Sequence, residues 1–527
     1  MIDLTVVDLS RLQFAATAMY HFLFVPLTLG LSFLMAIMES VYVMTGREIW
    51  RRMTLFWGTL FGINFAMGVA TGIVMEFQFG MNWSYYSHYV GDIFGAPLAI
   101  EGLMAFFLEA TFIGIFFFGW DRLSKVGHLV VTWLVAFGAN FSALWILIAN
   151  GWMQNPVGST FNPDTMRMEI TDFTSVIFNP VAQAKFVHTV SAGYVTGAMF
   201  IMSISAWFLL RGRHLELAKR SMAVAASFGL ASALSVVVLG DESGYVATEH
   251  QKMKIAAMEG MWETEQAPAG LNIFAIPGVR QNTYEVKVPY VMGLITTRSL
   301  NTEVPGILPL VELAESRIRN GMTAYAALDR IRVDASDAAA RETLANTWHD
   351  LGYGLLLKRY VEDVPSATEQ QIEHAAWDTV PNVPVLFWSF RFMVAIGIYL
   401  IAFFAVAFVL ASKHKLGDSR TLLWIALWSL PLPWIAIELG WLVAEYGRQP
   451  WVVEGVLPTF YAASGLTLTD LSISLGFFLT VYTVLAIIMV ILMLKVIKAG
   501  PSGKNVLIDG IGGSSRIPDG ATAAPDR

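Results

Sequence analysis

The 527 residues are 55% hydrophobic and only 14% charged, with 35 Phe, 24 Met and 17 Trp. This composition excludes an ordinary soluble globular protein, in which about a quarter of the residues are charged. Cysteine is absent, which excludes disulfides, cysteine-ligated iron–sulfur clusters and thiol catalysis. The net charge of −7 carries little information, and no basic stripe interleaved with aromatic residues indicates nucleic-acid binding.

Apolar runs long enough to cross a hydrocarbon core of about 30 Å occur about nine times along the chain. The fold class predicted from them is an all-α membrane protein, with transmembrane helices one to six in residues 1–240 and helices seven to nine in 387–497. No internal repeat and no interrupted helix is visible in the pattern. The predicted helices are 15–43, 53–79, 93–120, 127–150, 183–210, 217–240, 387–412, 421–446 and 468–497.

The basic residues of the short loops predict the orientation, because Lys and Arg are retained on the cytoplasmic side. They gather in every second loop, which places the N-terminus outside and the C-terminus in the cytoplasm. The chain begins without a basic segment or a small-residue cleavage site, so we expect the first helix to be kept as an anchor. The loop residues are Arg47, Arg51, Arg52, Arg122, Lys125, Arg211, Arg213, Lys219, Arg220, Lys413, Lys415 and Arg420.

Residues 241–386, between the sixth and seventh helices, form the only sizeable polar segment. By the same alternation it lies outside the membrane, and helical spacing near 311–332 and 336–358 predicts a folded extracytoplasmic loop domain. Residues 498–527 are rich in Gly, Ser, Pro and Ala, which predicts a flexible cytoplasmic tail.

Ionisable and sulfur-containing residues inside the predicted helices are the most informative, because charge in a membrane is costly and usually faces a cavity or a partner. His21, Glu101, His188 and Met393 each lie within about 12 Å of the outer end of a different helix, at 1.5 Å per residue. Each taken alone also fits a simpler interpretation, such as an interhelical hydrogen bond for a His or core packing for a Met.

The predicted helix 421–446 carries two acids and an indole on one stripe. Glu438, Trp441 and Glu445 follow the spacing i, i+3, i+7, so they share a face that should point into the bundle. Arg448 lies three residues after Glu445, and this pair equally fits an interfacial ion pair. A lipid-facing or core Trp is likewise the simpler interpretation of Trp441.

Axial haem ligation needs few residues, and this set contains them. A His and a Met from facing helices make a six-coordinate, low-spin haem suited to electron transfer, and His188 with Met393 fits that role. A five-coordinate haem with one open face needs a single ligand, for which His21 and Glu445 are the candidates. Trp441 is placed to pack between macrocycles.

Several stretches resemble subunit I of the cytochrome bd quinol oxidases, over nearly the whole chain except the C-terminal tail. They are "SRLQFAATAMYHFLFVPLTLG", "GINFAMGVATGIVMEFQFG", "GDIFGAPLAIEGLMAFFLEATF", "ALWILIANGWMQNP", "KFVHTVSAGYVTGAMF", "GDESGY" and "GWLVAEYGRQPW". The resemblance implies two haems b and one haem d. His188 and Met393 match the ligands of the low-spin haem b; of the other two positions, His21 is favoured for haem d and Glu445 for the high-spin haem b, the reverse remaining open.

The resemblance also implies roles for charged residues near these ligands. Arg448 is a donor for haem propionates, and Arg391 supplies positive charge near the low-spin haem. Lys254 and Glu259, in the loop after the sixth helix, match quinol-binding residues, with the Glu taking a proton as electrons leave. Without the resemblance, that pair fits a solvated helical charge pair. The loop is of the long form.

Three further residues predict a route for cytoplasmic protons. Glu101 and Glu109 lie eight residues apart on the third helix, about 12 Å in rise, and Ser142 lies on the fourth. Quinol oxidised outside and oxygen reduced with protons from inside would separate charge without a pump. A buried protonated acid is the alternative interpretation of Glu109.

The sequence therefore predicts the haem-bearing subunit of an electrogenic quinol:oxygen oxidoreductase in a bacterial inner membrane, with ubiquinol or menaquinol and O2 as substrates. The resemblance implies a second membrane subunit and small single-helix subunits as partners. A haem–copper oxidase is disfavoured because only His21 and His188 lie well inside helices, so no copper is expected. A proton-coupled transporter is the alternative, but it should show inverted repeats and broken helices, and neither is visible.

Overall fold

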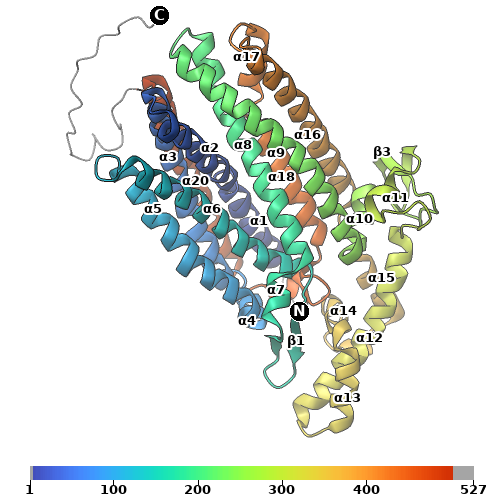
Figure 1. Ribbon diagram of the computed structural model, residues 1–527. Helices are drawn as coiled ribbons and strands as arrows, with labels where there is room; N and C mark the ends of the chain where they lie inside the picture. Colours follow the sequence, from blue (N-terminus) through green and yellow to red (C-terminus); the bar gives the residue numbers. More distant parts are fainter. Residues whose placement is uncertain (1–3, 502–527) are drawn as a thin grey trace, which may run out of the picture.

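The computed structural model describes residues 4–501, so residues 502–527 of the predicted tail lie outside the described residues. Within that part, nine helical segments are long and apolar enough to cross a membrane, which confirms the predicted number. The observed segments are longer than predicted, and the sixth continues to His250 instead of ending near residue 240. The segments run side by side as one bundle (Figure 1).

The segments are built from the following helices. In chain order these are α1 (Leu4–His21) with α2 (Val25–Thr45), α3 (Glu48–Met81), α4 (Ser84–Ile100) with the π-helix η1 (Glu101–Phe106) and α5 (Phe107–Phe118), α6 (Lys125–Gln154), α7 (Phe173–Ile177) with α8 (Pro180–Leu210), α9 (Leu215–His250), α16 (Val383–Ser412), α17 (Arg420–Trp428) with α18 (Leu432–Glu445) and the turn η5 (Tyr446–Arg448), and α20 (Leu468–Ala499).

The expectation of uninterrupted helices is wrong in three segments. Residues 22–24 separate α1 from α2, just before Pro26, and residues 429–431 separate α17 from α18 at Pro431. Proline has no backbone N–H to continue a helix, which accounts for both positions. The third interruption is the π-helix η1, a local widening that often occurs at functional sites.

Small residues allow the central helices to approach closely. A Cβ atom built on Gly197 of α8 would lie 2.6 Å from the backbone of Gly30 in α2, so only glycine fits at this crossing. Close contact through small residues is the usual way in which membrane helices pack. Helix α2 also packs against α3 and α6, while α9 and α18 each pack against both α8 and α16.

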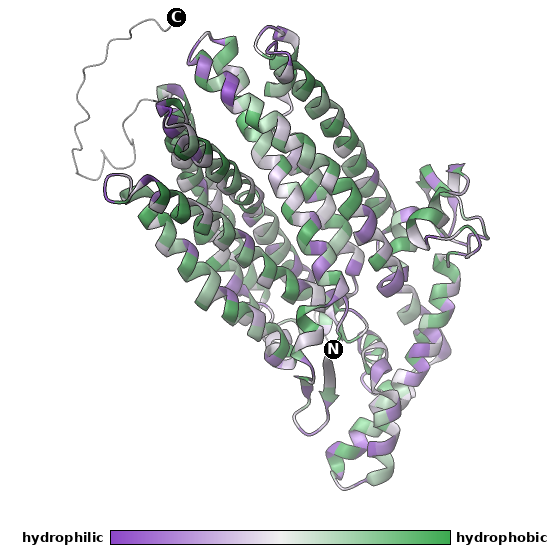
Figure 2. Cartoon of the chain, viewed as in Figure 1, coloured by the Kyte–Doolittle hydropathy of each residue, from purple (hydrophilic) through white to green (hydrophobic). Residues whose placement is uncertain are grey.

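The region between α9 and α16 folds as helices with one β-hairpin. Helices α12 and α13 extend away from the bundle in Figure 1, and Figure 2 shows mixed hydrophilic and hydrophobic residues along them, in contrast to the mostly apolar bundle. Its elements are α10 (Lys252–Glu259), β3 (Leu271–Pro277), β4 (Asn282–Val288), α11 (Val291–Thr296), α12 (Ile307–Val333), α13 (Ala338–Thr347), η2 (Trp348–Asp350), α14 (Leu351–Leu356), η3 (Leu357–Arg359), η4 (Val364–Ser366) and α15 (Glu369–Trp377).

The helical class is confirmed, although the description as purely α-helical is wrong. Besides the antiparallel pair β3–β4, the structure contains the hairpin β1 (Ser159–Asn162) with β2 (Arg167–Ile170), and β5 (Trp451–Val453) paired with β6 (Leu457–Pro458). The short helix α19 (Thr459–Ala462) follows β6. Helix α10 starts two residues after the end of α9, so Lys254 and Glu259, which are predicted to bind quinol, lie next to the end of a membrane segment.

Candidate functional site

His188 and Met393 lie on diagonally opposite members of a ring of four helices. His188 is on α8 and Met393 on α16, and the flanking helices α9 and α18 each pack against both. Both flanking helices place a glycine at the ligand. A Cβ atom on Gly240 of α9 would lie 3.1 Å from His188 Cε1, and one on Gly440 of α18 would lie 3.2 Å from Met393 Sδ. The two side chains therefore border space that larger residues would fill.

The imidazole of His188 is not tied to a side-chain partner. Within residues 4–501, its Nδ1 atom is buried without a well-formed hydrogen bond. The nearest polar group is the backbone of Val236 on α9. A ring nitrogen that faces a backbone group leaves the other nitrogen of the imidazole for a ligand, so an interhelical contact and a ligand role are compatible here.

His21 ends α1 at the first helix break, seventeen residues after Leu4, and so lies deeper than the predicted 10 Å. Its Nδ1 atom is 2.8 Å from Thr71 Oγ1, and the Thr71 hydroxyl donates to the Met67 carbonyl at 2.9 Å. When the Thr71 proton is on this carbonyl, Nδ1 donates to Thr71 Oγ1 and Nε2 keeps a lone pair. Gly72 faces this edge of the ring, since its Cβ atom would lie 3.2 Å from His21 Cε1.

Glu445, the last residue of α18, is surrounded by donors. Its Oε1 atom accepts from Asn150 Nδ2 and Gln154 Nε2, both at 3.0 Å, and lies 3.5 Å from Lys185 Nζ. Its Oε2 atom accepts from Arg448. Arg448 is only 6% exposed, so the ion pair that the sequence left open is present and buries its arginine. The Nε atom of Arg448 is buried and unpartnered among the described residues, and it remains available as a donor.

Lys254 of α10 extends the hydrogen-bonded group around Glu445 beyond the membrane segments. Its Nζ atom donates to Gln154 Oε1 at 2.5 Å and to Gln251 Oε1 at 2.8 Å, and Gln251 donates to Glu454 at 3.2 Å. Burial, and next the positive charge of Lys185, lower the pKa of Lys254 well below its usual range. Burial likewise raises the pKa of Glu454, against the effect of Lys254.

Glu259 points to a different part of the molecule. Its Oε2 atom accepts from Arg391 Nη2 at 2.6 Å, and Arg391 also donates to the backbone carbonyls of Met258 and Asn272. Burial raises the pKa of Glu259, and the guanidinium of Arg391 opposes this effect. Lys254 and Glu259 are 6% and 4% exposed, so the interpretation as a solvated charge pair is wrong. Arg391 therefore faces α10 and β3.

Trp441 lies between the surroundings of His21 and those of Glu445. Its ring packs edge-on against Phe22 at 4.9 Å and lies 5.6 Å from Lys185 Nζ. Glu438, one turn earlier on the same stripe, has both carboxylate oxygens buried and without partners among residues 4–501. The predicted stripe on α18 therefore does face the bundle interior.

The structure joins two of the three residues of the predicted proton route. Ser142 Oγ donates to Glu101 Oε1 at 2.6 Å, across the contact between α6 and η1. Glu109 is 6% exposed and packs on α6, where a Cβ atom at Gly138 would lie 3.4 Å from its Cβ. The π-helix η1 replaces the first part of the regular α-helix assumed between Glu101 and Glu109, and the two carboxyl groups interact electrostatically. Glu76 of α3, which the sequence analysis did not single out, interacts electrostatically with Glu101.

A separate buried cluster joins α2 and α6. His128 Nδ1 lies 2.6 Å from Glu39 Oε1, and Thr132 donates to Glu39 Oε2 at 2.5 Å. The Nε2 atom of His128 donates to the Phe116 carbonyl at 2.9 Å. No group of three or more His, Cys, Asp or Glu side chains that could hold a metal ion occurs in the described chain.

Sequence reasoning missed Asn150, Gln154 and Lys185, which hold Glu445. Lys185 carries a signal that could have found it, because a lysine three residues before His188 in a membrane helix needs a partner. The amides carry no such signal, since their partners lie about 290 residues further along the chain.

Comparison with known proteins identifies the family. Residues 9–501 match the family model described as cytochrome bd terminal oxidase subunit I. The chain belongs to this family. It is 54% identical over 499 residues to the cytochrome bd-II ubiquinol oxidase subunit 1 of Escherichia coli K12, covering 94% of this chain and 97% of that protein. It is 37% identical over 500 residues to the cytochrome bd ubiquinol oxidase subunit 1 of Bacillus subtilis 168, covering 94% of each.

A solved structure supports the same fold for this cytochrome bd subunit. The bd oxidase from Geobacillus thermodenitrificans matches with a TM-score of 0.76 and 24% identity, over 95% of this chain and all of that chain. The nine candidate membrane segments are thus part of a fold shared with a bd oxidase.

A cytochrome carries haem, and the side chains can be tested for their fit to it. His188 and Met393 have the required donor atoms and a glycine beside each, and His21 presents a free nitrogen lone pair next to Gly72. These three residues fit axial ligation. Glu445 fits less directly, because both its oxygens accept hydrogen bonds in this structure and one would have to exchange a donor for iron.

Proposed function

We propose that this chain is the haem-bearing subunit of an electrogenic quinol:oxygen oxidoreductase in the bacterial cytoplasmic membrane. The observation that carries the proposal is the placement of His188 and Met393 across one ring of helices, each with a glycine beside it. Family membership and the quinol oxidase names of its relatives support it. Bound haem would accept electrons from quinol and deliver them to O2, which is reduced to water.

The proposed cofactors are two haems b and one haem d, without copper or an iron–sulfur cluster. His188 and Met393 would hold the low-spin haem b as a His/Met pair, which raises the reduction potential. His21 is favoured for haem d, with its Nδ1 atom beside Thr71. Glu445 is favoured for the high-spin haem b, where Arg448 pairs with it and has one free N–H for a propionate.

Lys254 and Glu259 are the proposed quinol-binding residues. They lie on one short helix but contact different partners, so quinol would lie along α10 rather than between the two side chains. Glu259 is a proton acceptor suited to this role, because its raised pKa brings proton uptake closer to neutral pH. Gln154 connects Lys254 directly to Glu445, and this link joins the substrate end to α18.

Protons for oxygen reduction would come from the cytoplasm, by way of Glu109, Ser142 and Glu101. The hydrogen bond between Ser142 and Glu101 supplies one step of that route. The predicted orientation, with the α9–α16 connection outside, places quinol oxidation on the opposite face. Charge then separates across the membrane without a pump.

The proposed partners are a second membrane subunit and small single-helix subunits, with ubiquinol or menaquinol as the reductant. One observation favours the alternative of a proton-coupled transporter, because two membrane segments are broken and a third is widened. Transporters use such breaks at their binding sites. Membership in a terminal oxidase family outweighs this feature.

The test is the visible spectrum and the quinol-dependent oxygen uptake of the purified complex carrying His188→Ala or Met393→Leu. Both variants should lose the low-spin haem and quinol oxidation while keeping haem at the other positions. Met489→Leu on α20, far along the sequence from the ring, is the matched control and should keep both. Retention of the low-spin spectrum and of turnover by both variants would disprove the assignment.

A further inference from the structure

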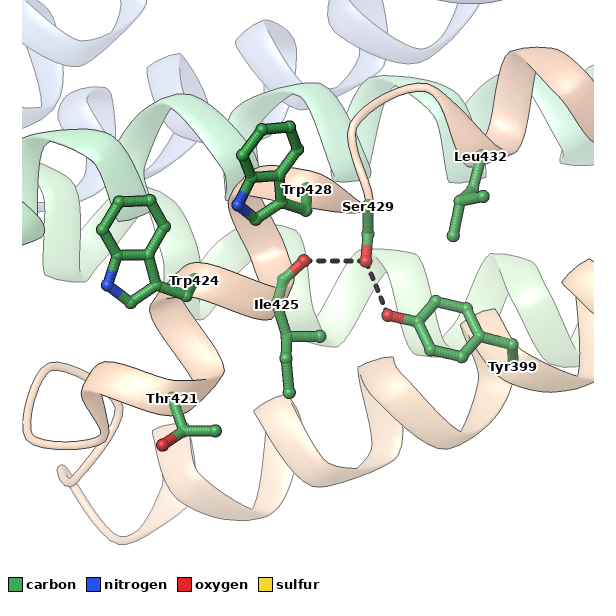
Figure 3. A pocket seen from close by; sticks show the side chains of 7 residues that line it. All are labelled: Tyr399, Thr421, Trp424, Ile425, Trp428, Ser429 and Leu432. Carbon is green, nitrogen blue, oxygen red and sulfur yellow. Dashed lines mark hydrogen bonds between the residues drawn. The ribbon is translucent and has the colours of Figure 1, made fainter.

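An open groove lies between α16 and the broken pair α17–α18, and none of its lining residues is among those proposed for catalysis (Figure 3). Its volume is about 540 Å³, and most of its lining is apolar or aromatic. The lining residues are Tyr399, Thr421, Trp424, Ile425, Trp428, Ser429 and Leu432.

The hydroxyl groups in the groove already satisfy one another. Ser429 Oγ donates to the Ile425 carbonyl at 2.8 Å, and Tyr399 Oη lies 2.6 Å from Ser429 Oγ, as the dashed lines of Figure 3 show. When the Ser429 proton is on the Ile425 carbonyl, Tyr399 is the donor to Ser429. The break between α17 and α18 is thus closed by side chains, and this part of the groove offers an apolar surface.

Two tryptophans on α17 line the groove with free donors. Trp424 and Trp428 lie one turn apart and are 48% and 76% exposed. Neither indole N–H has a hydrogen-bond acceptor in the described part of the chain. Exposed tryptophans of this kind are typical of the membrane interface, where the ring is in apolar surroundings and the N–H meets an acceptor.

The loop at the end of the groove is basic. Lys413, Lys415 and Arg420 form no ion pair within residues 4–501, and Asp418 is the single acid among residues 413–420. Lys219 from the start of α9 reaches the same loop, since a Cβ atom at Gly417 would lie 2.9 Å from its Cε. Arg420 directly precedes Thr421, so unpaired positive charge adjoins the groove.

We propose that this groove binds an anionic phospholipid, with the headgroup on the basic loop and an acyl chain along Ile425 and Leu432. Residues 421–432 span about 16 Å, close to half of a hydrocarbon core of about 30 Å. Phosphate and ester oxygens would accept from the indole N–H groups. The apolar surface of a partner's membrane helix offers fewer acceptors, because its backbone carbonyls are used internally. Basic pockets at helix ends commonly bind anionic lipid headgroups.

The first experiment equilibrates the purified complex with detergent micelles containing equal amounts of phosphatidylglycerol and phosphatidylcholine. The lipids retained by the protein are then quantified by mass spectrometry. The wild type should be enriched in phosphatidylglycerol. The variant Lys413→Gln/Lys415→Gln/Arg420→Gln should lose at least fivefold of that enrichment, since each charge near an anionic headgroup favours binding about fivefold.

A matched control removes three positive charges elsewhere at the same end of the bundle. Arg47→Gln/Arg52→Gln/Arg122→Gln alters residues that also form no ion pair in the described chain and do not line the groove. This control should retain the enrichment. Equal retention by the two triple variants, or no enrichment in the wild type, would overturn the proposal.

A second experiment asks whether protein covers the groove. Because the chain contains no cysteine, Trp428→Cys gives it a single thiol. In the purified complex, this thiol should react with a membrane-soluble maleimide as fully as the thiol of Ile473→Cys on exposed α20. Reaction only after the partner subunits are dissociated would assign the groove to a partner helix and overturn the lipid proposal.

Discussion

Two regions of the bundle carry the residues proposed as haem ligands, and they are built in opposite ways. Around His188 and Met393, the flanking helices withdraw their side chains, leaving glycine at both contacts. Around Glu445, the neighbouring helices supply donors until both carboxylate oxygens are engaged. The absence of side chains on the flanking glycines shapes the first region, and hydrogen-bond donors shape the second. A small change of volume should therefore disrupt the first, and a change of hydrogen bonding the second.

The largest effect is expected from filling the space beside His188. Gly240→Val should abolish the low-spin haem, because its Cβ atom alone would lie 3.1 Å from the imidazole. The spectrum of the reduced complex measures this directly. Gly244→Val, one turn further on the same helix, meets no atom within 4 Å and should retain the haem. Equal haem content in the two variants would show that space at Gly240 is unimportant.

A large effect is also expected from cutting the hydrogen-bonded link at Gln154. Gln154→Leu removes one donor to Glu445 and one acceptor of the buried Lys254, and each hydrogen bond to a charged group contributes about 1.5 to 3 kcal/mol. The apparent Tm of the complex and the rate of quinol oxidation should both fall. Met153→Leu, a neighbouring apolar exchange, is the control. Unchanged turnover would show that the hydrogen bonds of Gln154 to Lys254 and Glu445 are not needed for quinol oxidation.

A shift with pH is expected from Arg391→Gln. The guanidinium opposes the rise in the pKa of Glu259, so its removal should raise that pKa further. If ionised Glu259 takes the quinol proton, kcat/KM rises with pH through this pKa. The rising limb should therefore move to higher pH in the variant. Glu259→Gln should abolish the limb; a limb that stays in place in both variants would exclude Glu259 as the base.

The smallest effect is expected from Ser142→Ala, which removes one hydrogen bond to Glu101. Such a bond contributes about 1.5 to 3 kcal/mol when one partner is charged and less when both are neutral. Steady-state oxygen uptake should slow several-fold, while reduction of the low-spin haem by quinol in the absence of oxygen should keep its rate. Slowing of both steps alike would point to a general structural role for Ser142.

Much of the bundle could be predicted because long apolar runs have few alternatives in a membrane. The helix breaks near residues 22–24 and 429–431 could also have been predicted, because Pro26 and Pro431 lie beside them. The hairpin β3–β4 has an alternating pattern on both sides of a Gly-containing turn, "LNIFAIPGVRQNTYEVKV", which is a recognisable strand signal. The π-helix η1 has no comparable signal in its sequence.

The candidate site was predictable in its ligands but not in their surroundings. His21, His188 and Glu445 stand out because polar residues are rare in apolar helices. The glycines beside them are common residues, and their meaning appears only when Gly72, Gly240 and Gly440 are seen at the tips of those side chains. The sequence also does not show in which direction a side chain points. For this reason Lys254 and Glu259 were expected to act together, although they contact different helices.

The central claim is that this chain holds three haems, one of them an open oxygen-binding site. The most direct test is the dithionite-reduced minus air-oxidised visible spectrum of the purified complex, repeated under carbon monoxide. We expect b-type bands together with a band at longer wavelength that moves with carbon monoxide. The absence of haem bands from intact, folded complex would contradict it, and b-type bands alone would contradict the assignment of haem d.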